Sequence, residues 1–401
     1  MRTVRDIPLF ENIPILVRTA LNVPIKQGKV VNEYRLRRAV PTIRFLAERG
    51  AKVVLISHIG EQGTETLAPV ARALGRLVPG VSFFPETIGA GARAAVRDLA
   101  PGKILVLENL RRARGEREND PAFARELATL ADVFVEDSFD TCHRPHASII
   151  GVPKLLPSYA GLVLEEEVRE LSRALTPGRP ALAVIGGAKF STKEPVLTTL
   201  LEKYDHVFVG GALASDFLKA SGQPVGKSLV SDADPVRIRK LLANPKLVIP
   251  IDSLVVPAAK VGAADARSMA PQEYSHFSKS EYGQEKLVAR VAAAGQVRSD
   301  EVILDHGPGT SALLAALAEK AKSVLWNGPL GNYENGFTDA TDAFARAVAN
   351  SRAHSIVGGG DLIAAIERLG LLSQFSFVST GGGAMLEFLA KGTLPGIVAL
   401  G

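Results

Sequence analysis

The sequence predicts an α/β protein made of two doubly wound parallel-sheet domains that are joined by a hinge helix. Short apolar runs alternate with longer stretches of helical period along the 401 residues. This alternation is typical of right-handed βαβ crossovers, and therefore of parallel sheets. The residues that follow the strands also differ between the halves: they are polar or charged in the first half and glycine in the second. Because ligands bind at the carboxyl ends of parallel strands, we expect two different binding sites.

The expected elements follow from the length and period of each apolar segment. A helix over Glu165–Leu175, closed by Thr176-Pro177-Gly178, lies between the two halves and is the expected connection. The expected strands of the parallel sheets are Ile13–Val17, Val53–Ile56, Ile104–Leu107, Val133–Val135, Leu182–Ile185, Val207–Val209, Val302–Leu304, Val324–Leu325, Ile356–Val357 and Phe375–Val378. The expected helices are Arg35–Arg49, Leu67–Leu77, Ala122–Leu130, Val196–Leu201, Thr310–Lys320 and Asp339–Ala349.

Cationic side chains gather at or near the strand ends of the first half. Taken one at a time, each of them is typical of a protein surface. Taken together at one edge of a sheet, they predict a positively charged binding site for a small anion, because arginine binds carboxylate and phosphate with two parallel hydrogen bonds. The set comprises Arg18, Arg35, His58, Arg111, Arg112, Arg114, His143, Arg144 and His146.

Glycines take the corresponding places in the second half. Backbone without side chains allows a nucleotide and its phosphates to approach closely, so we interpret this edge of the second sheet as a nucleotide site. The alternative is that each glycine pair only forms a strand–helix turn. This interpretation explains the sequence less well as the number of glycine pairs at strand ends increases. The glycines are Gly186-Gly187, Gly210-Gly211, Gly307, Gly328, Gly358-Gly359-Gly360 and Gly381-Gly382-Gly383.

Three charged residues lie where helices of the second half are expected to begin. Lys189 and Lys193 are four residues apart and share one helix face. Two cations at the positive end of a helix repel each other unless an anion binds there; the alternative is a solvated pair. Asp361 follows three glycines. Its carboxylate could interact with the helix dipole, or it could bind magnesium together with phosphate oxygens, and both interpretations stay open.

Composition excludes several classes of protein. The 47 Lys and Arg residues against 42 Asp and Glu give a net charge of +5 without a basic block, so no nucleic-acid partner is expected. The single cysteine, Cys142, excludes a disulfide framework and a cysteine-based zinc cluster. No apolar run reaches the ~20 residues that span a bilayer, and the first 18 residues carry charges throughout. We therefore expect a cytoplasmic protein with no membrane partner.

Three sequence motifs of hydrolases are missing or incomplete. Residues 221–228 end in Gly-Lys-Ser like a phosphate-binding loop, but they begin with Ser221 instead of glycine and no helical pattern follows. We interpret this segment as an ordinary loop. Neither a HExxH motif nor a serine nucleophile elbow occurs, so hydrolase functions are disfavoured.

Eight motifs together resemble the phosphoglycerate kinase family, in the family's order and over essentially the whole chain. They are Val-Arg-Thr-Ala-Leu-Asn-Val-Pro (17–24), Ser-His-Ile-Gly (57–60), Leu-Glu-Asn-Leu-Arg (107–111), His-Arg-Pro-His-Ala-Ser (143–148), Gly-Gly-Ala-Lys (186–189), Trp-Asn-Gly-Pro-Leu-Gly (326–331), Val-Gly-Gly-Gly-Asp (357–361) and Ser-Thr-Gly-Gly-Gly-Ala (379–384).

The resemblance implies an organisation and a reaction. It implies an acceptor domain over 1–160, a hinge helix over 161–178, a nucleotide domain over 179–385 and a tail over 386–401 that returns to the acceptor domain. ATP or ADP with Mg²⁺ would bind the second domain, and a small carboxylate, 3-phosphoglycerate in the family, would bind the first. Hinge closure would then bring the two ligands together in a monomeric enzyme.

Residue roles carry over position by position. By resemblance, Arg35 meets the acceptor carboxylate and the transferring phosphoryl, Lys189 follows that phosphoryl and Lys193 holds the nucleotide phosphates. Asp361 would be the magnesium ligand and Glu334 the ribose contact. Catalytic roles fall on Arg35, Lys189 and Gly382; substrate contacts on Asn22, Arg35, His58, Arg111 and Arg144; nucleotide contacts on Gly187, Lys193, Gly211, Gly307, Pro308, Pro329, Glu334, Gly359, Gly360 and Asp361.

Departures from the family pattern concentrate in the acceptor half. Ala20 replaces an aspartate, Glu61 an arginine and Asp140 a glycine, so the acceptor pocket has lost one carboxylate and gained two. Glu61 could pair with Arg112, which itself replaces a phenylalanine, or with Arg114. The second half departs less: Thr192 replaces an aspartate, Ala212 a glycine, and Leu362 a threonine or serine.

Three functions remain compatible with these residues. The protein could be an ordinary phosphoglycerate kinase, or a kinase of the same fold that acts on another carboxylic acid, whose acyl phosphate is captured by an amine or a thiol. It could also be a non-catalytic nucleotide-binding relative. Intact Arg35, Lys189, Lys193 and Asp361 count against the third function. The acceptor that the first two would use stays open.

Overall fold

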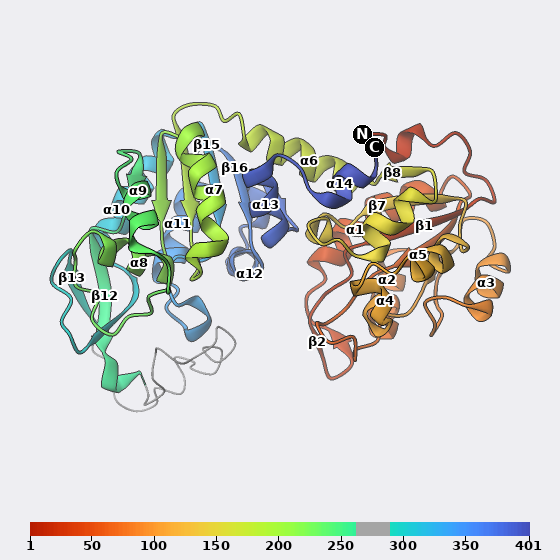
Figure 1. The fold of residues 1–401 in the computed structure, drawn as a ribbon, viewed down its shortest axis with the longest axis horizontal. Coiled ribbons are helices and arrows are strands. Elements are labelled where there is room, and N and C mark those ends of the chain that lie inside the picture. Colours follow the sequence, from red (N-terminus) through yellow and green to blue (C-terminus); the bar gives the residue numbers. More distant parts are fainter. Residues whose placement is uncertain (262–288) are drawn as a thin grey trace. The chain divides into compact units, whose positions relative to one another are not determined.

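The computed structural model describes residues 1–261 and 289–401, which form two compact units. The first unit consists of Met1–Arg169 and Thr393–Gly401, and the second consists of Glu170–Gly392. The boundary between the units falls within helix α6 (Leu162–Ala174), labelled in Figure 1.

The first unit is built on a six-stranded parallel sheet in the order β5-β6-β4-β1-β7-β8. The chain passes from β1 to β4 on one side, and after β6 it crosses back to β7 on the other side of β1, so the strand order reverses between β1 and β7. The carboxyl ends of these strands therefore open at a topological switch point. The strands are β1 (Pro14–Thr19), β4 (Lys52–Ile56), β5 (Val81–Phe83), β6 (Ile104–Val106), β7 (Val133–Asp137) and β8 (Ser158–Ala160).

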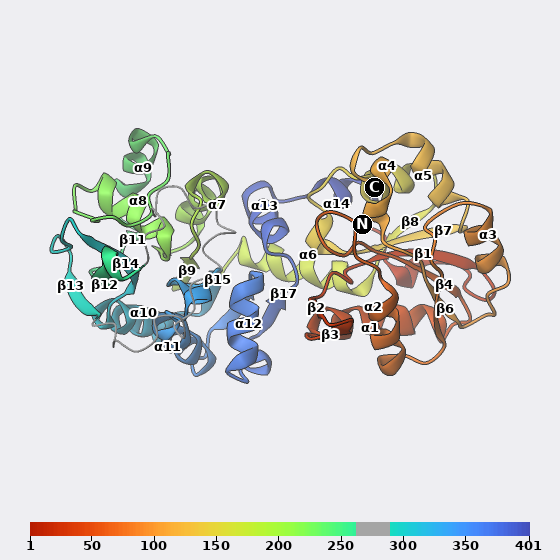
Figure 2. The same ribbon diagram turned by 90° about the horizontal axis from the view of Figure 1, so that it is seen from below.

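Helices cover both faces of this sheet: α1 and α2 lie on one face, and α4 and α5 on the other (Figure 2). Central strands that are buried on both faces are mainly apolar, and β1 and β7 become polar only at their carboxyl ends. Helix α1 turns Leu36, Ala39, Ile43 and Leu46, spaced three or four residues apart, into the core. The helices are α1 (Tyr34–Ala47), α2 (Ala68–Leu77), α3 (Ala90–Arg97), α4 (Arg114–Arg117), α5 (Pro121–Ala128) and α14 (Pro395–Ala399).

The last helix, α14, packs within the first unit although the chain reaches it only after the second. The Gly396 amide donates to the Cys142 carbonyl at 2.8 Å. A Cβ at Gly396 would lie 3.0 Å from the Cys142 Sγ, so glycine permits this close approach. The contact keeps Cys142 fully buried.

The second unit contains a six-stranded parallel sheet in the order β11-β10-β9-β15-β16-β17. Helices α7 and α13 lie on one face, and α10, α11 and α12 on the other (Figure 2). The strands are β9 (Ala181–Ile185), β10 (His206–Val209), β11 (Leu247–Val248), β15 (Ser323–Asn327), β16 (His354–Gly358) and β17 (Phe377–Ser379). The helices are α7 (Phe190–Lys203), α8 (Ala212–Ala220), α9 (Pro235–Leu242), α10 (Pro308–Lys320), α11 (Asp339–Ala349), α12 (Gly360–Arg368) and α13 (Gly383–Lys391).

One predicted strand lies in a different sheet. The run Val302–Leu304 forms β14 (Glu301–His306), which pairs antiparallel with β12 (Asp252–Pro257) in a three-stranded sheet completed by β13 (Arg290–Ala293). The prediction that this run joins the parallel sheet was wrong, because an apolar run indicates a strand but not its direction or partner. The other predicted strands lie in the two parallel sheets.

Two further findings concern segments singled out in the sequence. Residues 221–228 form turns and loop between α8 and α9, which confirms their interpretation as a loop. In the part of the chain that the structure describes, no helix combines the length and the apolar character that a membrane crossing needs.

Candidate active site

Four arginines lie around His58, which follows β4: Arg18 in β1, Arg35 in α1, Arg111 after β6 and Arg144 after β7. Burial lowers the pKa of His58 well below its ordinary value, and the positive charges of Arg18, Arg111, Arg144 and Arg35 lower it further. We call these four arginines the arginine cluster. Three of these five residues are not surface residues: Arg18, His58 and Arg111 are 1%, 4% and 3% exposed.

Arg18 forms the buried floor of the arginine cluster. Its guanidinium donates to the Ser148 Oγ, the Thr19 carbonyl and the His58 Nδ1, each at 3.1 Å. Since arginine can only donate, the His58 Nδ1 accepts and the ring carries its hydrogen on Nε2. His58 therefore offers a neutral N–H donor to a ligand.

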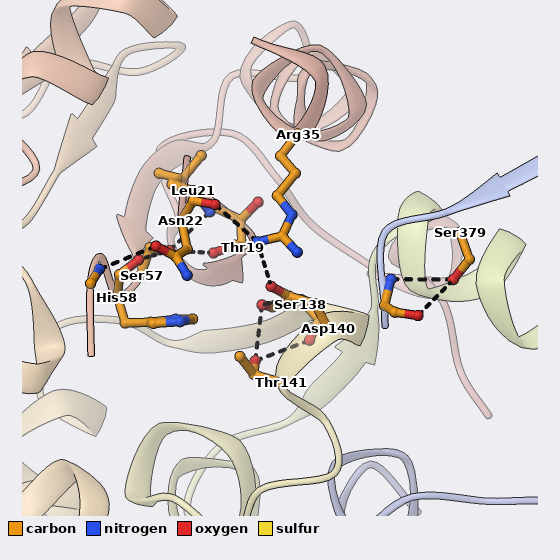
Figure 3. Close-up of polar contacts among 12 residues, drawn as sticks. Thr19, Leu21, Asn22, Arg35, Ser57, His58, Ser138, Asp140, Thr141 and Ser379 are labelled. Carbon is orange, nitrogen blue, oxygen red and sulfur yellow. Dashed lines mark hydrogen bonds and ion pairs between the residues drawn. The ribbon is translucent and has the colours of Figure 1, made fainter. Parts of the chain in front are cut away.

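Arg35 and Asn22 form a second part of the site, shown in Figure 3. Arg35 is the second residue of α1, and its guanidinium donates to the Asn22 carbonyl at 2.9 Å. The Asn22 side-chain oxygen accepts from the Gly60 amide at 3.1 Å, which orients the amide group. On its other side Arg35 lies 3.4 Å from the Asp140 carboxylate.

Arg111 carries a buried hydrogen-bond donor that has no partner among the described residues. Its Nη1 donates to the Gly60 carbonyl and lies 3.1 Å from the Glu61 carboxylate. Its Nη2 is buried and has no acceptor in the part of the chain that the structure describes. An unpaired buried donor costs ~1–3 kcal/mol, and more when it is charged, so this atom indicates an anion site.

Glu61 pairs with Arg111, and not with Arg112 or Arg114, the partners that the sequence suggested. Those two arginines pair instead with Glu108 (3.2 Å) and Glu118 (2.5 Å). The sequence pattern missed this arrangement because Glu61 and Arg111 are brought together by the sheet, and no local spacing relates them.

The second unit contains a cavity of about 710 Å³ at the carboxyl ends of its strands. Its lining includes six residues that were predicted to bind the nucleotide or to act in transfer: Gly187, Lys189, Gly211, Pro329, Glu334 and Asp361. The predicted residues Lys193, Gly307, Pro308, Gly359, Gly360 and Gly382 do not line it.

Glycines in and beside the lining of this cavity allow backbone segments to cross closely. A Cβ at Gly186 would collide with the Pro329 carbonyl. Gly211 has φ +64° and its amide donates to the Leu330 carbonyl at 2.8 Å. Side chains at these positions would separate the loops that follow β9, β10 and β15.

The two lysines lie at the start of α7. Lys189 occupies the cap position and is exposed, and its ammonium has no acceptor among the described residues. Lys193 donates to the Asn327 side-chain oxygen at 3.2 Å, and its Cε lies 3.5 Å from where a Cβ of Gly187 would be. Burial lowers the pKa of Lys193 to about 8. A buried ammonium beside bare backbone at a helix N-terminus suits a phosphate.

The lowered pKa of Lys193 predicts a pH dependence of nucleotide binding. Phosphate oxygens favour the charged lysine and would raise its pKa, so binding should take up a proton at pH 9 but not at pH 7. Affinity for Mg-ATP should therefore fall as pH rises above about 8. Calorimetry in two buffers of different ionisation enthalpy measures the uptake.

A matched variant controls for other groups. Lys193→Arg keeps its charge at pH 9 and should abolish the proton uptake. Equal uptake in the wild type and in this variant would contradict the assignment of Lys193 to the phosphates.

Two carboxylates line the same cavity. Asp361 lies in the first turn of α12, and Glu334 lies in the turn Tyr333–Asn335. Burial raises the pKa of Glu334, and the negative charge of Asp361 raises it further, so the two groups are close enough to repel each other. Carboxylate oxygens facing a phosphate site fit Mg²⁺, which binds through one or two carboxylates and phosphate oxygens. Among the described residues there is no group of three or more potential metal ligands, so phosphate oxygens would have to complete the site.

The start of α10 is occupied by a side chain of the protein itself. The Asp252 carboxylate accepts from the Gly309 and Thr310 amides, both at 2.8 Å, and from the Thr310 hydroxyl at 2.6 Å. Although burial opposes the shift, these hydrogen bonds hold the pKa of Asp252 below its ordinary value. The amides that follow Gly307 and Pro308 are therefore already satisfied.

Asp252→Ala should destabilise the second unit by about 2 kcal/mol, because it removes a charged cap with three hydrogen bonds. Urea unfolding measures the loss. Asp120→Ala, which removes a single-bond cap of α5 in the first unit, is the matched control and should cost about 0.5–1 kcal/mol. Stability equal to the wild type, together with tighter ATP binding, would show instead that this helix start binds phosphate.

Sequence reasoning missed several polar residues of the cavity, among them Asp305, Tyr333, Asp232 and Arg237. Asp305 is the last residue but one of β14, and burial raises its pKa to about 7. A polar residue at a strand end was the signal used in the first half of the chain, and it would have found Asp305. The loop residue Asp232 has no comparable signal.

A doubly wound sheet carries a cavity lined by glycines, Lys189, Glu334 and Asp361, and Lys193 lies on the same helix start as Lys189. These features define a nucleotide-binding α/β protein. The arginine cluster adds a separate anion site. Comparison with known proteins then places the chain: the family model described as phosphoglycerate kinase matches residues 4–392. The chain belongs to the phosphoglycerate kinase family, whose members are phosphotransferases that act on a carboxyl group and use Mg-ATP or ADP.

Individual relatives support this placement over the full length. The chain is 42% identical to the phosphoglycerate kinase of Moorella thermoacetica, covering 99% of this chain and 98% of the relative. It is 42% identical to that of Thermus thermophilus, with all of both chains covered. The structure of phosphoglycerate kinase from Coxiella burnetii superposes with a TM-score of 0.80 at 38% identity over 99% of this chain and 98% of that chain. The structure of phosphoglycerate kinase from Pyrococcus horikoshii superposes with a TM-score of 0.84 at 28% identity, over 100% of this chain and 98% of that chain.

Proposed function

We propose that the protein reversibly transfers the γ-phosphoryl group of Mg-ATP to the carboxylate of a small acid, with 3-phosphoglycerate as the family's acceptor. A carboxylate oxygen forms the new bond to phosphorus, and the bond to the β,γ-bridging oxygen breaks, so that ADP leaves with that electron pair. The observation that carries the proposal is the placement of Lys189 and Lys193 at the start of α7, beside a cavity that Asp361 and Glu334 also line.

The roles of the residues follow from their surroundings. Lys193 is buried and held by Asn327, so it fixes the nucleotide phosphates. Lys189 is exposed and unpaired among the described residues, so its ammonium can follow the phosphoryl group during transfer. Phosphoryl transfer needs positioning and positive charge more than covalent catalysis, which is what these lysines supply. Mg²⁺, with Asp361 as its proposed ligand, would supply further neutralisation of the phosphate charge.

The acceptor half binds and orients the carboxylate. Arg35 is fixed by the Asn22 carbonyl, and Arg111 presents the unpaired Nη2. His58 adds a neutral N–H donor. Gly382, at the start of α13, stays in the proposal only through the family pattern.

A coupled ADP-release assay with a set of carboxylic acids that includes 3-phosphoglycerate tests the proposal. Mg²⁺-dependent ADP release that requires an acid supports it. Tight Mg-ATP binding without release for any acid would favour a non-catalytic nucleotide-binding relative. We further propose that the protein is cytoplasmic and monomeric. Sedimentation of the purified protein would check the monomeric state.

A second candidate function is favoured by the acidic residues of the acceptor site. Glu61 and Asp140 each contact an arginine that the family uses for the substrate. A kinase of the same fold could therefore act on a different carboxylic acid, whose acyl phosphate would then feed amide or thioester formation. The kinetic comparison of acids in the same assay distinguishes the two functions.

A further inference from the structure

Two carboxylates lie at the cationic acceptor site, each beside one arginine of the arginine cluster. The Glu61 carboxylate lies 3.1 Å from the Arg111 Nη1, and the Asp140 carboxylate lies 3.4 Å from the Arg35 Nη1. The Asp140 side chain is only 6% exposed and also accepts from the Ser138 hydroxyl at 2.7 Å. Asp140 is thus held within the site and is not a passing surface contact.

These two carboxylates change the charge that a ligand meets. Arg35, Arg111 and Arg144 bring three positive charges, and Glu61 and Asp140 offset two of them. His58 adds none, because its lowered pKa keeps the ring neutral. The charge left over matches one carboxylate. A phosphorylated acid carries about two further negative charges on its phosphate, which this site does not balance.

The fourth arginine of the cluster, Arg18, is buried and does not contact the ligand directly. The guanidinium of Arg18 is hydrogen-bonded within the protein, to Ser148, Thr19 and His58. Burial raises the pKa of the buried acids Glu116 and Glu136, and the positive charge of Arg18 acts against this shift, so the charge of Arg18 also serves these internal groups.

The geometry of Arg111 leads to the same conclusion. Arginine binds phosphate best through two parallel hydrogen bonds, which use two nitrogens of the fork. Here Nη1 is occupied by the Gly60 carbonyl and Glu61, and only Nη2 is buried without a partner among the described residues. Glu61 and Gly60 therefore block the Nη1–Nη2 edge of Arg111 for a two-bond contact with a phosphate.

We propose that Glu61 and Asp140 are specificity-determining residues that select an unphosphorylated monocarboxylic acid bearing a hydrogen-bond donor, an amine or a hydroxyl. This inference rests on the proposed phosphoryl transfer to a carboxylate. The carboxylate of the acid meets the arginine cluster, and the donor group meets Glu61 or Asp140. Glu61 is 71% exposed, so its side chain can turn towards such a group without unfolding anything around it.

Steady-state kinetics with the full chain test this proposal. The wild type should use short amino or hydroxy monocarboxylic acids with a kcat/KM at least about tenfold above that for 3-phosphoglycerate. Glu61→Gln and Asp140→Asn should each lower the KM for 3-phosphoglycerate by about tenfold, with kcat changed much less, since each removes a like charge from beside the phosphorylated ligand. The same variants should lose activity with the amino acids.

Binding supplies a readout that does not depend on turnover. Calorimetric titration with 3-phosphoglycerate alone should show tighter binding in Glu61→Gln and Asp140→Asn. The matched control is Glu118→Gln, which removes an exposed carboxylate paired with Arg114 in the same unit and should change neither affinity nor KM. Thermal unfolding of each variant confirms that it folds.

The outcomes distinguish the proposed transfer reaction from the proposed choice of acid. A wild type that uses 3-phosphoglycerate at least as well as the other acids, with no gain in the variants, overturns the inference and leaves the proposed transfer reaction intact. A wild type that binds Mg-ATP but releases ADP with no acid overturns the transfer reaction, and this inference with it.

Discussion

Lys189→Ala is expected to lower kcat by about 10²–10³-fold while leaving the affinity for Mg-ATP nearly unchanged. The Lys189 ammonium is exposed and unpaired among the described residues, so it holds nothing in the resting protein. A contact made only in the transition state affects kcat alone. Loss of one such charged or hydrogen-bonding contact costs ~2.7–4 kcal/mol in comparable sites.

Lys193→Ala should show the opposite pattern, because Lys193 is already held by the Asn327 side chain and lies beside Gly187 before reaction. It should weaken Mg-ATP binding more than it lowers kcat. Lys320→Ala, an exposed lysine in the last turn of α10, is the control and should change neither quantity. If Lys189→Ala lost ATP affinity and kept kcat, the proposed roles of the two lysines would be reversed.

Arg18→Met should destabilise the first unit by about 3–5 kcal/mol, the usual cost of removing one partner from a buried charged network. Arg18 is 1% exposed and carries the positive charge that opposes the burial of Glu116 and Glu136. Burial already raises the pKa of both carboxyl groups, and losing Arg18 would raise them further. Hydrogen exchange of the β1 and β4 amides measures the stability of this unit.

The pH dependence of the Arg18→Met effect has a definite sign. A carboxyl group whose folded pKa is raised contributes stability at low pH, and this contribution is lost as pH rises through the folded pKa. The variant should therefore come closest to the wild type in acid and fall further behind as pH increases. Arg114→Met, an 88% exposed arginine, is the control and should change stability by less than about 0.5 kcal/mol. A similar loss in both variants would contradict the buried network.

Much of the fold could be predicted because its strands are buried on both faces. Segments such as Val53–Ile56 and Leu182–Ile185 are continuous apolar runs that only a covered parallel sheet requires. The edge strands β5, β8 and β11 were missed because none of them is a continuous apolar run of three or more residues. The antiparallel pairing of β14 was missed because no local pattern encodes a partner.

The candidate site was predictable where residues follow strands, and not where distant residues meet. Positions such as His58 and Gly187 could be found from their place after an apolar run. The ion pairs of Glu61 with Arg111 and of Asp140 with Arg35 join segments about 50 and 105 residues apart, and only the sheet order brings them together. The Asp252 cap of α10 is likewise a long-range contact.

Trapping of the product with hydroxylamine tests the central claim, transfer of a phosphoryl group to a carboxylate, most directly. Hydroxylamine converts an acyl phosphate into a hydroxamate and does not react with the free acid. With Mg-ATP and a panel of carboxylic acids that includes 3-phosphoglycerate, the wild type should form a hydroxamate that depends on the acid, on Mg²⁺ and on Lys189. Binding of Mg-ATP without hydroxamate from any acid would contradict the claim.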